Sequence, residues 1–172
     1  MKIRSVEPKD YEAIHALIQE AYAESKTGYN VEVELVKVIR TEPTYNPNLE
    51  IVAIEDGQIV GHGILSEIAI GIRGDIGLAM APLVVKPSYQ GKGIGKALLQ
   101  ELEERARKYG YGFISVMDLP KYYEKFGYEP TSKYDITAPF TVPQKAYMIK
   151  AIKPHGLDGV RGQIDYLPKF GI

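Results

Sequence analysis

The chain has 172 residues, which is enough for one ordinary globular domain with a core of its own. Hydrophobic residues make up 45% of it and charged residues 25%, which excludes global disorder. The formal net charge is −1, so there is no basic field that would attract nucleic acid. No apolar run approaches the roughly 18–20 residues of a membrane span. We therefore expect neither a nucleic acid nor a membrane as a partner.

The cysteine and histidine content narrows the chemistry further. There are no cysteines, which excludes disulfides, thiolate metal ligands and an acyl-cysteine intermediate. The three histidines, His15, His62 and His155, are far apart in sequence and lack the spacing of metal-ligand pairs, so no metal is expected. The amino terminus turns polar at once and lacks a signal-peptide core, so a cytoplasmic location is expected.

The first part of the chain predicts a strand, two helices and a hairpin. Residues 2–6 have the pattern of a short strand, and apolar residues fall on one helical face over residues 11–22. A second helix is expected after Asn30, whose side chain can cap the free N–H groups. Asp56-Gly57 tolerates positive φ angles and therefore predicts a tight hairpin inside a strand pair at residues 51–70.

The second part predicts another turn and a long helix. The turn is expected at residues 71–77, and an apolar strand follows from Leu78 to Val85. The clearest helical pattern covers residues 93–109, because apolar residues recur there at every fourth position, and Gly110 ends it. Shorter elements are then expected: a strand at 113–117, a helix after Pro120 that ends before Gly127, closing strands at 134–136 and 145–152, and an extended piece around 163–167.

The order of these elements indicates the fold class. Strands and long helices in mixed order are typical of an α/β or α+β fold, in which helices pack on a sheet. The pattern alone does not choose between the possible topologies, and no internal repeat is visible.

The most informative segment is a strand that runs into a loop with alternating glycines, followed by a helix. Gly91, Gly93 and Gly95 would let a bulky phosphate approach the backbone. The start of a helix exposes unpaired N–H groups and the positive end of the helix dipole, both of which attract anions. Lys92 and Lys96 add positive charge nearby. The segment therefore predicts a pyrophosphate-binding loop.

The spacing of this loop excludes two common nucleotide-binding motifs. A Walker loop would need a glycine at the position of Gln90 and a serine or threonine at that of Ala97. A dinucleotide fingerprint would need a glycine at the position of Lys96. A nucleotide-binding hydrolase is therefore disfavoured.

The remaining pattern, Gln90-x-x-Gly93-x-Gly95 after an apolar strand, resembles the coenzyme A loop of the GNAT superfamily of acetyltransferases. Residues 122–128 are similar to the family's late motif, in which Tyr-Glu-x-x-Gly is followed by an aromatic residue. The resemblance covers the chain to about Ile152 and points to the YhbS-like branch of bacterial N-acetyltransferases. The chain departs from the family at the end of the strand at 113–117, where many members carry Asn, so a contact through that Asn is not carried over.

The resemblance implies a GNAT fold: a mixed, mostly antiparallel central sheet, splayed between its fourth and fifth strands and flanked by helices. It implies a single acetyltransferase domain over residues 1–172, with residues 153–172 as a C-terminal extension packed on it. The cosubstrate would be acetyl-CoA, with its pantetheine arm between the strands ending at Val85 and Met117. The cofactor-binding residues implied in this way are Leu83, Val84, Val85, Gln90, Gly91, Lys92, Gly93, Ile94, Gly95, Lys96 and Tyr123.

The reaction implied by the resemblance is direct transfer of the acetyl group from the thioester to an amine. A lysine-like amine, with a pKa of about 10.4, must first lose a proton, and a departing thiolate, with a pKa of about 8.5, benefits from a proton donor. The family motif places the donor at Tyr123, and the adjacent Tyr122 would point in another direction on the same helix.

Several parts of this hypothesis stay open at the level of sequence. The general base is Glu67, Asp118, Glu124 or a water chain, and His62 is expected to be structural rather than catalytic. The acceptor is a small-molecule or peptide amine, and a homodimer is possible. The alternative function is a catalytically silent GNAT-fold module that binds coenzyme A or acyl-CoA as a sensor or a scaffold.

Overall fold

The computed structural model describes residues 1–23, 29–117, 120–139 and 147–166. The chain forms two compact units, each assembled from two segments. Unit 1 contains Met1–Leu65 and Ala81–Arg105, and unit 2 contains Ser66–Met80 and Ala106–Ile172. The chain passes between the units inside two long strands and one long helix. None of the helices in the described ranges is long and apolar enough to cross a membrane.

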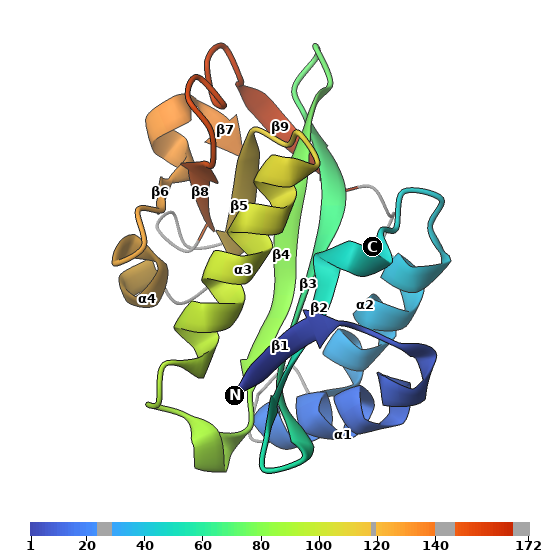
Figure 1. Ribbon diagram of the computed structural model, residues 1–172. Helices are drawn as coiled ribbons and strands as arrows, with labels where there is room; N and C mark the ends of the chain where they lie inside the picture. Colours follow the sequence, from blue (N-terminus) through green and yellow to red (C-terminus); the bar gives the residue numbers. More distant parts are fainter. Residues whose placement is uncertain (24–28, 118–119, 140–146, 167–172) are drawn as a thin grey trace. The chain divides into compact units, whose positions relative to one another are not determined.

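Unit 1 combines antiparallel strands with three helices (Figure 1). Its elements are β1 (Lys2–Ser5), α1 (Tyr11–Ala21), α2 (Tyr29–Thr41), β2 (Glu50–Glu55), the first part of β3 (Gln58–Ile70), the last part of β4 (Asp75–Val85) and most of α3 (Ile94–Lys108). Short 3-10 helices at Pro8–Asp10, Pro47–Leu49 and Pro87–Tyr89 connect them. The strands β1, β2 and β3 pair antiparallel in that order.

The β2–β3 hairpin confirms the turn predicted from the sequence. Asp56 and Gly57 have φ angles of 53° and 73°, so both lie in the left-handed region that a two-residue hairpin requires. Glu55 pairs with Gln58 directly across this turn. The tip of the hairpin is therefore fixed by local sequence chemistry.

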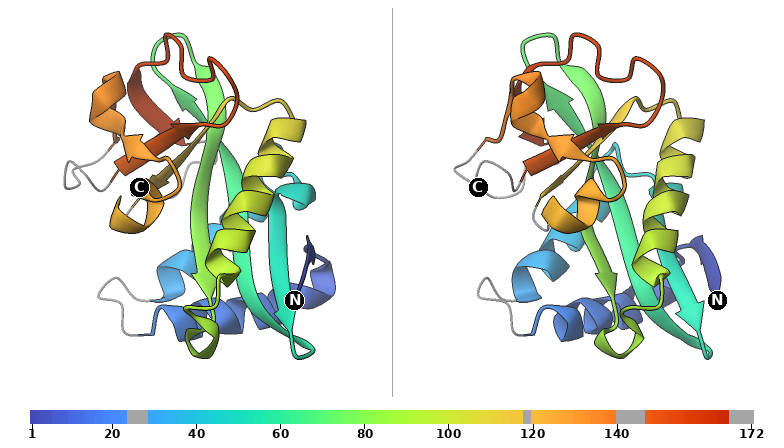
Figure 2. Two further views of the ribbon diagram at one scale, coloured as in Figure 1. Left: turned by 60° about the vertical axis from the view of Figure 1, so that its left-hand side comes forward. Right: turned by 90° about the vertical axis from the view of Figure 1, so that its left-hand side faces the viewer.

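The strands of unit 1 are covered on both faces, with α1 and α2 on one side and α3 on the other (Figure 2). Glycines on β3 let α3 approach closely. A Cβ at Gly61 would come within 2.8 Å of the Leu98 side chain, and one at Gly63 within 2.8 Å of the Leu102 side chain. Both leucines are fully buried, as the helical periodicity predicts. Because side chains alternate along a strand, His62 faces the α1 and α2 side.

Unit 2 is built from shorter elements. They are the end of β3, the start of β4, β5 (Phe113–Met117), α4 (Pro120–Glu124), β6 (Glu129–Pro130), a 3-10 helix (Thr131–Tyr134), β7 (Ile136–Thr137), β8 (Tyr147–Ala151) and β9 (Gly162–Tyr166). Its core gathers buried apolar side chains from these strands, among them Ile68, Phe113, Ile149 and Ile164. Residues 145–146 and 167 of the predicted late strands lie outside the described ranges.

The described strands pair in the order β1-β2-β3-β4-β5-β8-β6, with β7 and β9 off this path. The recorded pairs are antiparallel except β4 with β5 and β7 with β9, which are parallel. The β4–β5 pairing is short, because it contains only Leu78 with Ile114 and Ala79 with Ser115. β4 continues to Val85, and the described residues include no β5 partner for it beyond Ala79. The recorded pairing between the fourth and fifth strands therefore ends at Ala79. The mixed, mostly antiparallel sheet flanked by helices that the family resemblance implied is confirmed.

Two predicted boundaries were wrong. Helix α2 begins at Tyr29, so Asn30 lies inside the helix and is not its cap. Strand β4 begins at Asp75, three residues before the predicted start at Leu78. The turn before it already closes at Gly74, whose N–H donates to the carbonyl three residues earlier at 3.1 Å, so the next residues are free to join the strand.

The strand predicted at residues 134–136 was also wrong. Residues Thr131–Tyr134 form a 3-10 helix, and Asp135 adopts a left-handed conformation with φ 57° that breaks the backbone direction. Only Ile136–Thr137 is extended, and it pairs parallel with β9. The two-residue strand Glu129–Pro130 was not predicted, because its extended form comes from pairing with β8 rather than from its own pattern.

Candidate functional site

The loop between β4 and α3 presents its backbone to open space. Gly91 and Gly93 have φ angles of 77° and 84°, which favour glycine. A Cβ at either position would meet no atom within 4 Å. An incoming group can therefore approach the backbone at Gly91 and Gly93.

The amides of this loop are available to a ligand. The first backbone hydrogen bond of α3 runs from the N–H of Ala97 to the carbonyl of Gly93, at 3.1 Å. Within the part of the chain that the structure describes, the N–H groups of residues 91–96 have no recorded acceptor. Unpaired N–H groups at the start of a helix form an anion-binding site, and Lys92 and Lys96 are exposed beside them.

The residues that lead into the loop are held by hydrogen bonds. The side-chain amide of Gln90 donates to the carbonyl of Val85 at 3.2 Å, which ties the loop to the end of β4. Val84 is buried, and Leu83 and Val85 are partly exposed. The predicted cofactor residues from Leu83 to Lys96 thus form one continuous strand, loop and helix start in unit 1.

In unit 2, Tyr123 lies in a small aromatic cluster at the end of α4. Its ring makes edge-to-face contacts with Tyr122 and Tyr128, at centroid distances of 5.2 and 5.6 Å. Tyr123 is buried, with 6% of its surface exposed, and burial raises the pKa of the neighbouring Tyr122. Gly127, with φ 91°, ends the helix, and the N–H of Tyr128 donates to the carbonyl of Tyr123 at 3.3 Å.

The candidate bases are placed differently. In unit 2, Glu67 accepts a hydrogen bond from the Tyr111 hydroxyl at 2.6 Å. Tyr111 precedes β5, whereas Tyr123 follows it, and the five residues of β5 span roughly 17 Å at about 3.3 Å per residue. Glu124 is exposed on α4, and Asp118 lies outside the described residues.

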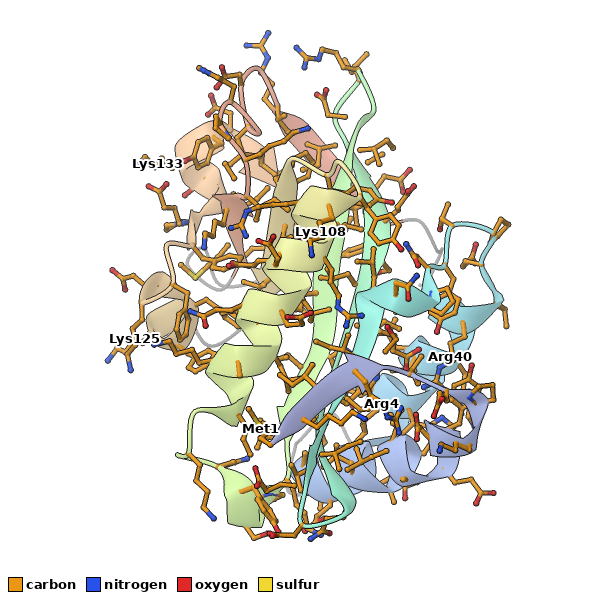
Figure 3. The ribbon with its side chains drawn as sticks, viewed as in Figure 1. Met1, Arg4, Arg40, Lys108, Lys125 and Lys133 are labelled. Atoms are coloured by element: carbon orange, nitrogen blue, oxygen red, sulfur yellow. The ribbon has the colours of Figure 1, made fainter. Side chains whose placement is uncertain are left out.

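A buried charged cluster in unit 1 was not singled out by the sequence. Glu50 is fully buried. Arg40, which is labelled in Figure 3, donates to it from α2 with hydrogen bonds of 3.1 and 2.5 Å. Tyr45 donates to the same carboxylate at 2.6 Å, and His62 Nε2 lies 2.8 Å from it. We call Arg40, Tyr45, Glu50 and His62 the Glu50 cluster. The one sequence signal was a carboxylate directly before the apolar run Ile51–Ile54.

The Glu50 cluster fixes the charge state of its carboxylate. Burial alone would raise the pKa of Glu50, but hydrogen bonds from His62, Arg40 and Tyr45 outweigh it and lower this pKa to about 2. Glu50 is therefore ionised at neutral pH. His62 is buried with one nitrogen bonded to Glu50, which fits the structural role expected for it, and its Nδ1 has no partner among the described residues.

Comparison with known proteins gives matches in sequence and in structure. The family profile described as "Acetyltransferase (GNAT) domain" matches residues 47–130. The uncharacterized N-acetyltransferase YjhQ of Escherichia coli K12 is 30% identical over 121 residues, covering 69% of this chain and 67% of YjhQ. The uncharacterized N-acetyltransferase YhbS of the same strain is 26% identical over 171 residues, covering 99% of this chain and 98% of YhbS.

Solved structures agree in fold. The crystal structure of Escherichia coli YhbS in complex with CoA superposes with a TM-score of 0.84 at 26% identity, over 99% of this chain and 93% of that one. A GNAT family acetyltransferase from Brucella melitensis, in complex with acetyl-CoA, gives a TM-score of 0.76 at 26% identity, over 96% and 94% of the two chains.

The mixed sheet, the glycine loop at the start of α3 and these matches together define an acetyltransferase. More particularly, the chain belongs to the GNAT superfamily of N-acetyltransferases, as the sequence motifs implied.

Proposed function

We propose that this chain binds acetyl-CoA through residues 90–96 and transfers the acetyl group directly to an amine acceptor. The observation that carries the proposal is the run of amides at residues 91–96, for which the described part of the chain offers no acceptor. A pyrophosphate would supply acceptors to these donors and negative charge to the helix dipole. Lys92 and Lys96 would add to the attraction.

The pantetheine arm of the cofactor would bind along β4. Beyond Ala79 the described residues give this strand no partner on β5, so backbone groups of Leu83, Val84 and Val85 can pair with the pantetheine amides as a further strand would. Related GNAT proteins crystallised with CoA and with acetyl-CoA support the choice of this ligand. The cofactor would supply the activated acetyl group, and no metal is proposed.

In the proposed reaction the neutral amine nitrogen attacks the thioester carbonyl carbon, the C–S bond breaks, and an amide forms. We assign Tyr123 as the donor that protonates the departing thiolate, because a tyrosine is protonated at neutral pH. The amine proton leaves to Glu124, to Asp118 or to water. Glu67 is the weakest candidate for this base, because its carboxylate is bonded to Tyr111 at the other end of β5 from Tyr123.

The Tyr123 assignment is tested by Tyr123→Phe. Turnover should fall by about 10²–10⁴, the usual worth of a positioned proton donor. The affinity for coenzyme A should fall far less than turnover, because the proposed phosphate and amide contacts are kept. The assay follows thiol release from acetyl-CoA across a panel of amino acids, polyamines and peptides. Tyr122→Phe is the matched control, and equal turnover of Tyr123→Phe and wild type would refute the assignment.

The same panel separates the enzyme from the silent module. Thiol release with any amine favours the enzyme and identifies the class of acceptor, a small molecule or a peptide. Coenzyme A binding without release for every amine favours a sensor or scaffold. The proposal also takes residues 1–172 as one functional domain located in the cytoplasm. Cell fractionation tests the location, and ultracentrifugation tests the possible homodimer.

A further inference from the structure

The β2–β3 hairpin is joined to the glycine loop by a small set of side-chain hydrogen bonds in unit 1. The Tyr89 hydroxyl donates to Asp56 Oδ2 at 2.8 Å and accepts from Gln58 Nε2 at 3.1 Å. Gln58 in turn accepts from the Lys86 ammonium at 3.2 Å. We call Asp56, Gln58 and Tyr89 the hairpin latch. It fixes the position of the Tyr89 ring three residues before the first lysine of the loop.

The Tyr89 ring, which the latch holds, also contacts a positively charged side chain of the loop. The Lys92 ammonium lies 4.9 Å from the centroid of the Tyr89 ring, within the range of a cation–π contact. Asp56 bonds the hydroxyl of the ring, while the ammonium lies over its face. The hydrogen bond to Asp56 also raises the pKa of Tyr89, which keeps its hydroxyl protonated and able to donate.

We propose that Tyr89 is a positioning residue for the cofactor: the hairpin latch holds its ring, the ring holds the Lys92 ammonium beside the loop amides, and the latch thereby sets the affinity for the phosphate-bearing part of acetyl-CoA. This inference rests on the proposed function. It adds residues outside the glycine motif, and it ties the loop to a hairpin more than thirty residues earlier in the chain.

The physical reason is the cost of ordering a loop on binding. Residues 91–96 must direct several N–H groups at one anion, and glycines lose more conformational freedom than other residues when they are fixed. A loop that is already held loses less entropy when the ligand arrives, so the same contacts give a higher affinity. The hairpin is well suited to hold it, because its turn is itself closed by two left-handed residues.

The test removes the latch and keeps the ring. Tyr89→Phe retains the face on which Lys92 lies but loses the hydroxyl. Asp56→Asn keeps a residue that tolerates the left-handed conformation and loses the charge of the acceptor. We expect each variant to bind coenzyme A about three- to tenfold more weakly by calorimetry at low salt, the range for one lost hydrogen bond.

The double variant tests whether the two residues act as one device. If the two residues act as a single device, the double variant should bind coenzyme A no more weakly than the single variant with the lower affinity. If they act independently, the two fold-losses of affinity would multiply. Tyr111→Phe is the matched control, because it removes a tyrosine–carboxylate hydrogen bond of 2.6 Å in unit 2 and should leave the affinity unchanged. Multiplying effects, or an equal loss in the control, would count against the latch.

The choice of ligand shows whether the effect concerns phosphate. We expect the Tyr89→Phe loss with coenzyme A, and no loss with pantetheine, which lacks phosphate and is measured by NMR titration. A loss that persists with dephospho-CoA assigns the effect to the pyrophosphate, and a loss confined to coenzyme A assigns it to the 3′-phosphate. Both outcomes support the latch. An equal loss with pantetheine overturns it.

The wild-type titration separates a failure of the proposed function from a failure of the latch. Wild-type protein that binds no coenzyme A overturns the proposed function and the latch together. Wild-type protein that binds coenzyme A with the same affinity as Tyr89→Phe and Asp56→Asn overturns the latch alone and leaves the proposed function in place.

Discussion

Two polar regions of unit 1, the Glu50 cluster and the glycine loop, differ in whether the protein itself supplies partners to their hydrogen-bonding groups. Glu50 is fully buried, and three neighbouring side chains bond its carboxylate. The described residues supply no acceptor to the N–H groups of residues 91–96, and the space around Gly91 and Gly93 is open. Buried polar groups need hydrogen-bond partners from the protein itself, whereas exposed donors remain available to a ligand. The first region is therefore expected to maintain the fold and the second to bind the cofactor.

Strand β3 contributes to both regions through its alternating faces. His62 joins the Glu50 cluster on one face, and its neighbours Gly61 and Gly63 pack on the other face against α3, the helix whose start forms the loop. The two functions should therefore be separable by mutation. Stability should respond to changes in the Glu50 cluster, and cofactor affinity should respond to changes in the loop.

The largest effect is expected for Glu50→Ala. It leaves the buried Arg40 without its partner, so the free energy of unfolding should fall by about 3–5 kcal/mol. Urea unfolding followed by circular dichroism measures this. The exposed Glu12→Ala should change stability by less than about 0.5 kcal/mol. If Glu50→Ala does not fold, Tyr45→Phe removes one donor and should cost about 1 kcal/mol.

The coenzyme A affinity of the same variants tests whether the Glu50 cluster affects stability alone. The folded fraction of Glu50→Ala or Tyr45→Phe should bind coenzyme A as wild type does, because neither residue belongs to the loop. A large loss of affinity at temperatures where the variant is fully folded would break the proposed separation.

The contribution of the Glu50 cluster to the free energy of unfolding should decrease as the pH falls. Glu50 has a pKa of about 2 in the folded protein and an ordinary value of 4.5, so its contribution is complete above pH 4.5 and is lost as the pH falls through about 2. The stability gap between wild type and Glu50→Ala should therefore narrow from pH 5 towards pH 2. A gap that stays constant in unfolding experiments over this range would contradict the ionised, hydrogen-bonded carboxylate.

A smaller effect is expected for Gly93→Ala, which is compared with Gly74→Ala. Both glycines have positive φ angles, 84° and 68°, and open space around a Cβ, so both variants should lose about 1 kcal/mol of stability from backbone strain. Only Gly93→Ala should weaken coenzyme A binding, by about tenfold, because it disturbs the direction of the loop amides. Equal affinities of the two variants would contradict the assignment of the loop.

The smallest effect is expected for Lys96→Gln. This exposed side chain adds only a screened charge to the loop, so coenzyme A binding should weaken by about two- to fivefold at low salt. The difference from wild type should shrink as the salt concentration rises, which calorimetry at two ionic strengths measures. A loss that does not depend on salt would indicate a role other than long-range attraction.

Local sequence was sufficient for much of the fold. The hairpin at Asp56-Gly57 and the helix Ile94–Lys108 follow from turn chemistry and from apolar periodicity, which act over a few residues. The prediction failed where pairing partners decide the structure. Glu129–Pro130 is extended because it pairs with β8, and the left-handed Asp135 ends an apparent strand.

The loop and the Glu50 cluster differ in the same way. The candidate cofactor residues from Gln90 to Lys96 are consecutive, so their glycine spacing and helix start could be recognised in the sequence alone. Arg40, Glu50 and His62 come from three elements, and their spacing in the sequence does not predict that they are in contact. The hairpin latch was invisible for the same reason, because Asp56 and Tyr89 lie on different elements.

The sequence by itself therefore determined the family, the order of the main elements and the residues of the glycine loop. These depend on contacts between residues that are close in the chain. Only the tertiary structure decided which buried charges neutralise one another, which side chains hold the loop, and where the pairing of β4 with β5 ends. Those features depend on residues brought together by folding, and a single sequence does not reveal such long-range pairs.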